Sequence, residues 1–173
     1  MLRSSRWWLI GCLTCEWLAL GIWVGGLLVL IGAVIPAVFN TFGGQDSGGF
    51  FLTRAFEGYN RFAIGALTVL CAGTWYRWWS GNQDVAVSRA EMGLLMGMTV
   101  IAGIIILWLH PLVASLQAQA FAVKEEAARK AAFEAFFRIH MPVRSLYMVN
   151  LVLGIVLTGM KAQRSLRRDR VVT

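Results

Sequence analysis

Charged residues are scarce in this chain, and their scarcity excludes an ordinary water-soluble domain. Only 14% of the 173 residues are Asp, Glu, Lys or Arg, whereas 58% are hydrophobic. Soluble domains carry roughly 25% charged and about 45–50% apolar residues. This apolar excess is too large for the interior of one small soluble domain, so lipid must solvate much of the surface. We therefore expect an integral membrane protein that forms one compact bundle.

Other absences remove further classes of protein. The three cysteines all lie in apolar runs, so an extracytoplasmic disulfide framework is unsupported. The chain has no glycine-rich phosphate loop, no zinc-helix motif and no nucleophile elbow, and we predict a non-enzymatic protein with no catalytic residues. The net charge of +7 forms no basic stripe with interleaved aromatics, which argues against DNA or RNA as a partner.

Long apolar stretches between the few charges predict four transmembrane helices. A bilayer core of about 30 Å needs about 20 helical residues. The two shorter stretches reach this length if their flanking arginines snorkel toward the interface. The spans are expected at approximately residues 8–39, 60–79, 91–112 and 143–161. The predicted fold class is therefore all-α, a polytopic four-transmembrane-helix bundle that makes up a single membrane domain.

A helical extramembrane segment is expected between spans three and four, at approximately residues 113–140. It is rich in alanine and carries charges of both signs. Pro111 should kink the helix that enters this segment, because proline removes a backbone donor and crowds the preceding turn. Pro142 should end the segment and begin span four. Another helix is expected to begin near Asp46 or Ser47 and to run directly into span two.

The lysines and arginines near the span ends predict the orientation. The N-terminus, the loop after span two and the C-terminus together hold nine of them, against seven on the opposite side. Arg3 and Arg6 precede span one, and no positive charge follows it until Arg54. The positive-inside rule therefore places both termini in the cytoplasm, and we expect the chain in a bacterial cytoplasmic (inner) membrane.

Glu16 is the acid that lies clearly inside a predicted span. An ionised carboxylate there costs about 2.5–3.5 kcal/mol on insertion scales, so Glu16 should be neutral, paired or open to a wet cavity. One hypothesis makes Glu16 the proton or cation site of a small transporter. The alternative is a protonated Glu16 that is hydrogen-bonded within the bundle or reaches the cytoplasmic interface. Asn150, inside span four, is expected to hydrogen-bond to another helix.

The cysteines suggest a metal site. Cys12, Cys15 and Glu16 share one helix face, and Cys71 is expected at a comparable depth. Three thiols and a carboxylate would suit a soft metal or a redox pair if the thiols deprotonate. The alternative is that these cysteines only fill space as small apolar side chains.

The two histidines suggest a cofactor site. His110 ends span three and His140 precedes span four, so both are predicted at the outer interface. Two facing imidazoles can bind haem, or copper with the help of nearby methionines. The alternative is that they hydrogen-bond to lipid headgroups, to Asn150 or to loop carbonyls. Our leading prediction is that the protein holds no cofactor.

Several short motifs resemble those of a known membrane-protein family. In chain order they are Gly21-Ile22-Trp23-Val24-Gly25-Gly26, Pro36-Ala37-Val38-Phe39, Tyr59 with Phe62, Pro111, Phe137-Arg138-Ile139-His140, and Asn150 with Gly154. Together they span roughly residues 17–160 and look like the transmembrane protein 205-like family of uncharacterised four-helix integral membrane proteins. The resemblance implies a four-helix membrane bundle and transfers no activity to any residue. Glu16, Cys12 and Cys15 depart from the family's pattern.

Three functional hypotheses follow. The leading one is a non-enzymatic membrane bundle that acts alone or as an accessory subunit of a membrane complex, with the lipid bilayer, other membrane subunits or a second copy as partners. The second is a small transporter or proton-coupled carrier that uses Glu16. The third is a haem- or copper-binding redox protein that uses His110 and His140.

Overall fold

Every element is helical in the parts of the chain that the structure describes. The computed structural model describes residues 6–43, 46–81 and 85–172, and Arg3 lies outside them. The elements are α1 (Arg6–Val29), the π-helical segment η1 (Leu30–Val34), α2 (Ile35–Phe42), α3 (Asp46–Ser80), α4 (Arg89–Gly103), the π-helical segment η3 (Ile104–Leu109), α5 (His110–Ala122) and α6 (Glu126–Val172). The predicted all-α class is therefore confirmed.

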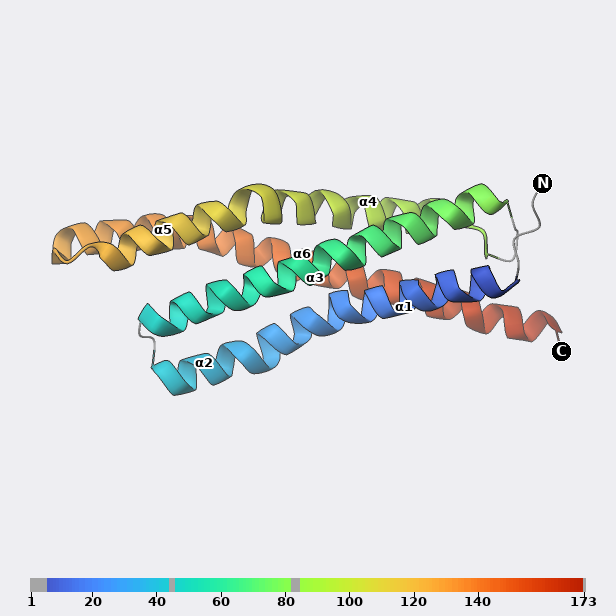
Figure 1. Cartoon of the computed structure of the whole chain (residues 1–173), viewed down its shortest axis with the longest axis horizontal. Coiled ribbons are helices and arrows are strands. Elements are labelled where there is room, and N and C mark those ends of the chain that lie inside the picture. The colour runs from blue at the N-terminus through green and yellow to red at the C-terminus, as the bar shows by residue number, and fades with distance from the viewer. Residues whose placement is uncertain (1–5, 44–45, 82–84, 173) are drawn as a thin grey trace.

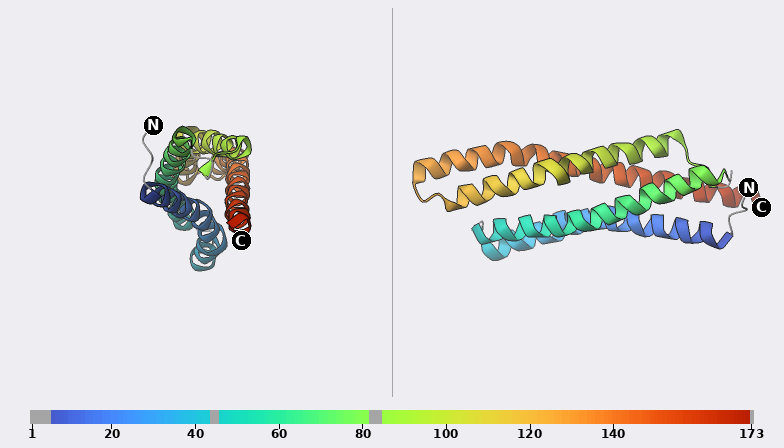
Figure 2. Two further views of the ribbon diagram at one scale, coloured as in Figure 1. Left: turned by 90° about the vertical axis from the view of Figure 1, so that its right-hand side faces the viewer. Right: turned by 45° about the horizontal axis from the view of Figure 1, so that its top comes forward.

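These elements form four long helical rods that lie side by side (Figure 1, Figure 2). The first rod is α1, η1 and α2, the second is α3, the third is α4, η3 and α5, and the fourth is α6. α1 packs along α3, and α6 packs along α4, α5 and α1. Because each rod runs opposite to the one before, both termini lie at the same end (Figure 1). We call this the terminal end; it holds the start of α1, the end of α3, the start of α4 and the end of α6.

Local sequence signals set the rod boundaries. Gly43 and Gly81 follow the first two rods with φ angles of +58° and +62°, a left-handed conformation that glycine adopts without strain. The third rod begins after Ser88, whose hydroxyl accepts a hydrogen bond from the backbone N–H of Glu91 at 3.1 Å. The second rod begins at Asp46, as the sequence predicts.

Each π-helical segment ends two residues before a proline. Pro36 is the second residue of α2, and Pro111 is the second residue of α5. Proline lacks a backbone N–H and its ring crowds the preceding turn, so regular α-helical pairing fails there. The N–H of the residue before each proline instead donates five residues back, to the carbonyl of Leu30 or of Ile105. At Pro111, where the sequence predicts a kink, the structure has a widened π turn within a continuing rod.

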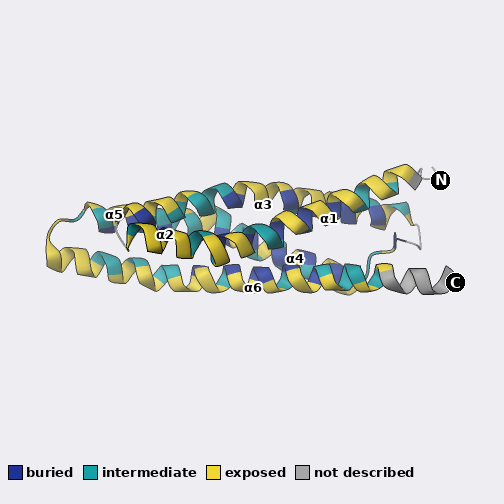
Figure 3. Ribbon diagram, turned by 90° about the horizontal axis from the view of Figure 1, so that it is seen from below, coloured by how far each residue is buried: buried dark blue, intermediate teal, exposed yellow. Residues whose placement is uncertain are grey.

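A stripe of buried side chains at helical spacing runs along each rod (Figure 3). The stripes comprise Leu20, Trp23, Leu27 and Leu30 on the first rod, Tyr59, Ala63, Ala66 and Leu70 on the second, Leu95, Met98, Ala102 and Ile105 on the third, and Val143, Tyr147, Leu151 and Leu157 on the fourth. Steps of three or four residues, with the step from Leu151 to Leu157 passing through the buried Gly154, keep one helix face toward the core. The four stripes meet in a single hydrophobic core.

Large apolar side chains also cover the outside of the rods. Examples are Trp8, Leu28, Phe62, Trp79, Leu107, Trp108, Val152 and Ile155. Three helical stretches are long and apolar enough to cross a membrane, Trp7–Phe42, Arg89–Ala122 and Glu126–Ser165. They match the predicted spans one, three and four. α3 does not reach the same apolarity, so a fourth crossing stays a prediction.

The region between spans three and four differs from the prediction. Pro142 does not end a helix, because α6 runs through it from Glu126 to Val172. The chain turns instead at 123–125, so the segment predicted at 113–140 is a hairpin of two helix ends. A proline removes one backbone hydrogen bond, but the buried Val143 and Tyr147 that follow it hold this part of α6 against the core.

Candidate functional site

Five charged residues continue the buried stripes at the terminal end of the bundle. They are Glu16 on α1, Arg77 on α3, Glu91 on α4, and Lys161 and Arg164 on α6. The first four lie four or seven residues from an apolar member of their stripe, which places them on the inward face of the helix. We call these five residues the ion-pair cluster.

Glu16 is 1% exposed and pairs with cations from two other helices. Its Oε1 accepts a hydrogen bond from Nε of Arg77 at 2.8 Å, and its Oε2 accepts one from Nζ of Lys161 at 2.5 Å. The sequence left open whether the Glu16 side chain is neutral, ion-paired or exposed to a water-filled cavity. The structure places it in an ion pair.

Glu91 is 2% exposed and pairs with all three cations of the cluster. Its Oε1 accepts a hydrogen bond from Nη2 of Arg77 and lies 2.8 Å from Nζ of Lys161. Its Oε2 accepts a hydrogen bond from Nη1 of Arg164 at 2.7 Å. Each of the four carboxylate oxygens in the ion-pair cluster therefore has at least one cationic partner, and the cluster links all four rods.

The cluster carries one positive charge in excess, since three cations face two carboxylates. The Arg77 side chain is 5% exposed and that of Lys161 9%, whereas that of Arg164 is 34% exposed. Burying an ion costs several kcal/mol unless good pairing geometry offsets the loss of water. The paired geometry is what permits these charges in the core, and the most exposed cation lies at the edge.

The cluster also holds the connection between α3 and α4. Nη1 of Arg77 donates to the backbone carbonyl of Val85 at 3.4 Å, and Nη1 of Arg164 donates to that of Ala86 at 3.3 Å. Val85 is itself buried. The end of α6 and the segment before α4 are thus fixed to each other through arginine side chains.

Gly73 makes room for the Glu16 side chain. A Cβ atom at residue 73 would lie 2.5 Å from Oε1 and 2.8 Å from Cγ of Glu16. Only glycine therefore allows α3 to approach the carboxylate this closely. Arg77 follows Gly73 by one helical turn, so the close approach also brings its guanidinium to the same carboxylate.

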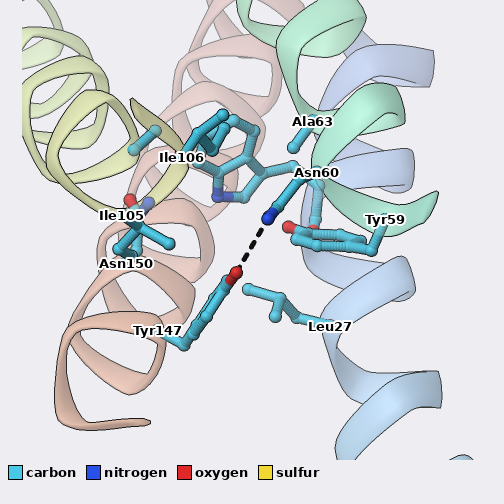
Figure 4. A pocket seen from close by; sticks show the side chains of 10 residues that line it. Leu27, Tyr59, Asn60, Ala63, Ile105, Ile106, Tyr147 and Asn150 are labelled. Atoms are coloured by element: carbon cyan, nitrogen blue, oxygen red, sulfur yellow. Dashed lines mark hydrogen bonds between the residues drawn. The ribbon is translucent and has the colours of Figure 1, made fainter. Parts of the chain in front are cut away.

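A second group of buried polar side chains lies around a pocket between the rods (Figure 4). The Tyr147 hydroxyl donates to Oδ1 of Asn60 at 2.9 Å, and the Tyr59 hydroxyl donates to the backbone carbonyl of Trp23 at 3.0 Å. Asn150, predicted to hydrogen-bond to another helix, is 3% exposed and belongs to the same group. Its Oδ1 has no hydrogen-bond partner among the described residues.

The cysteines do not form one cluster with Glu16. The Cys12 thiol lies 3.9 Å from Oε1 of Glu16 and 3.7 Å from the carbonyl of Gly73, but Cys15 and Cys71 are exposed. In residues 6–43, 46–81 and 85–172, no group of three or more His, Cys, Asp or Glu is arranged to hold a metal ion. The proposed soft-metal site therefore gains no support from the fold.

The histidines lie toward the end opposite the termini, on the third and fourth rods. His110 opens α5 directly after η3 and is half-buried. The His140 ring stacks on Phe136 with centroids 5.1 Å apart and meets Phe137 edge-on at 6.5 Å. These contacts are to its own helix, and haem or copper binding by the two histidines stays a prediction.

The sequence indicated Glu16 as a candidate site residue but did not indicate its partners. Arg77, Lys161 and Arg164 were counted there only among the basic residues at span ends that predict the orientation. The signal that was missed is their spacing along each helix. Each of these carboxylates and cations lies at a position where the buried stripe of its helix would continue. Two acidic and three basic side chains at such inward positions, all at the same end of the bundle, are expected to form ion pairs with one another.

The long apolar helices and their apolar exterior define the class of this protein, a helical integral membrane protein. A family model described as a domain of unknown function (DUF4149) matches residues 18–122, more than half of the chain. The chain belongs to this family. The matched region includes Arg77 and Glu91, whereas Glu16, Lys161 and Arg164 lie outside it. No curated protein and no solved structure matches the chain.

Proposed function

We propose that all four rods cross the membrane, with both termini in the cytoplasm of a bacterial-type cell. α3 has lower apolarity partly because of Arg77, yet this side chain is buried among carboxylates and does not face the surroundings. The outward side chains of residues 62–79 of α3 include Phe62, Ile64, Val69 and Trp75. The surface that α3 offers to lipid is therefore apolar, as a span requires. The resemblance to the transmembrane protein 205-like family agrees with this proposal.

The function that the site supports best is that of a non-enzymatic membrane bundle, acting alone or as an accessory subunit. The observation that carries this proposal is the complete pairing of the Glu16 and Glu91 oxygens. A carboxylate that exchanges protons during transport must lose its cationic partners in part of the transport cycle, whereas a carboxylate with a structural role keeps them. The cluster joins all four rods, so we interpret it as a structural ion-pair network that holds the four rods together at the terminal end.

Proton flux distinguishes the bundle from a carrier that uses Glu16. The purified protein is reconstituted into liposomes that contain a pH-sensitive dye, and flux is driven by a pH step. Glu16→Gln is compared with Glu57→Gln, which removes a carboxylate from an exposed pair with Arg54 and Arg61. We expect the flux of wild-type liposomes to equal that of empty ones. Flux that wild type and Glu57→Gln support and Glu16→Gln abolishes would contradict the proposal.

One version of this proposal makes the protein an accessory subunit that binds a partner in the membrane. The exposed apolar side chains on every rod can pack against lipid, another subunit or a second copy. Purification in mild detergent, followed by native mass spectrometry, measures which of these occurs. An accessory subunit is recovered with one partner at fixed stoichiometry. A monodisperse single chain contradicts the subunit form and leaves a bundle that acts alone.

A further inference from the structure

A small cavity lies inside the bundle core, between the four rods. It is lined by residues of α1, α3, η3 and α6, with Ala102 at its α4 side, and Figure 4 shows how the labelled side chains converge on it. Its volume is about 10 Å³. This is about the space that one sphere of water radius needs, and it is too small for any larger ligand.

Three buried polar atoms around this cavity have no hydrogen-bond partner within the described residues. They are Nε1 of Trp23, Nδ2 of Asn60 and Oδ1 of Asn150. All three residues line the cavity, and they are 1%, 4% and 3% exposed. Unpaired buried polar groups are rare in folded proteins because each loses its bonds to water without replacement. Three of them around one cavity therefore point to a shared ligand.

We propose that the cavity is a binding site for one water molecule that bridges three rods. The water oxygen accepts hydrogen bonds from the indole N–H of Trp23 and from the amide N–H of Asn60. One of its hydrogens is donated to Oδ1 of Asn150. Buried waters typically make about three such bonds, so this single ligand pairs all three atoms.

The donor set and the π turn both favour water over other small ligands. Two N–H groups aimed at the site repel a metal cation, and the carbonyl oxygen of Asn150 disfavours an anion. The adjacent residues Ile105 and Ile106 both line the cavity, although neighbours on a regular α-helix point about 100° apart. Both belong to η3, whose wider turn leaves space beside the helix.

The sign of a stability change tests this proposal. If water is bound, Asn150→Leu removes its acceptor and leaves the Trp23 and Asn60 donors unpaired, so the unfolding midpoint in lipid nanodiscs should fall by at least about 3 °C. If no water is bound, the same change replaces an unpaired acceptor by an apolar group, and the midpoint should rise. Val152→Leu, on the exposed face of α6, is the matched control and should leave the midpoint unchanged.

Solution NMR provides a second test, whose main readout comes from the wild-type protein. In deuterated nanodiscs, the indole N–H signal of Trp23, assigned by its loss in Trp23→Phe, should show a cross-relaxation peak to water. We expect this peak in the wild type and its loss in Asn150→Leu. A wild-type Trp23 indole without the peak, or a raised midpoint for Asn150→Leu, would overturn the proposed water site.

Discussion

Replacing Arg77 by methionine should remove one of the two cations that pair with both carboxylates of the ion-pair cluster. The guanidinium hydrogen-bonds to Glu16 and to Glu91, and it also donates to the Val85 carbonyl. Methionine keeps most of the side-chain volume but none of these bonds. The perturbation is therefore electrostatic, with little change in packing.

The structure sets the size of the expected loss. Removing one partner of a buried ion pair costs about 3–5 kcal/mol of unfolding free energy. In Arg77→Met, Glu16 keeps Lys161, Glu91 keeps Lys161 and Arg164, and the cluster becomes neutral. We therefore expect the lower limit, about 3 kcal/mol. Glu91→Gln leaves three cations facing Glu16 alone, so its loss should be larger, toward about 5 kcal/mol.

Reversible unfolding in mixed micelles, followed by circular dichroism, measures these differences. The matched control is Arg61→Met, because the Arg61 side chain is 76% exposed and pairs with Glu57 at the surface of α3. Exposed pairs contribute little to stability, so this control should unfold as wild type does. Equal unfolding free energies for Arg77→Met and Arg61→Met would refute the interpretation that the ion-pair cluster holds the four rods together.

Two further predictions concern the approach of helices to one another. Gly73→Ala should lower the unfolding free energy by about 1–3 kcal/mol, because the new methyl group would overlap Glu16, whereas Gly65→Ala has open space and should not; equal values in the same micelle assay would contradict this. Tyr59→Phe removes the hydrogen bond to the Trp23 carbonyl and should cost about 0.6–1 kcal/mol, a loss that thermal unfolding in nanodiscs detects as a lowered midpoint.

Local patterns in the sequence predicted part of the helical architecture. The polar cluster before α3 and the apolar spacing beyond it predicted a helix that begins near Asp46 or Ser47 and runs directly into span two, and α3 is one unbroken helix from Asp46 to Ser80. Pro142 was predicted wrongly because the rule for proline considers only the backbone bond that is lost. In the fold, Val143 and Tyr147 are buried against the other rods, and that packing keeps α6 continuous. Such contacts between distant segments are not visible in a local pattern.

The candidate site could be predicted only in part for a similar reason. The cost of a charge in lipid correctly indicated that Glu16 would need compensation. Its partners lie 61 and 145 residues away in the sequence, at Arg77 and Lys161. Basic residues at span ends are also what the positive-inside rule expects of anchors, so their composition does not distinguish an anchor from a buried partner. Only their position on the same helix face as the buried stripe distinguishes a buried ion-pair partner from an interface anchor.

A scan of topology reporters tests most directly whether four rods cross the membrane. Reporters that are active on only one side are fused after Gly43, Gly81, Lys124 and Thr173, in the full chain or in truncations that end there. We expect the Gly81 and Thr173 fusions to report the cytoplasm and the Gly43 and Lys124 fusions to report the opposite compartment. If Gly43 and Gly81 report the same compartment, α3 does not cross, and the four-span bundle is contradicted.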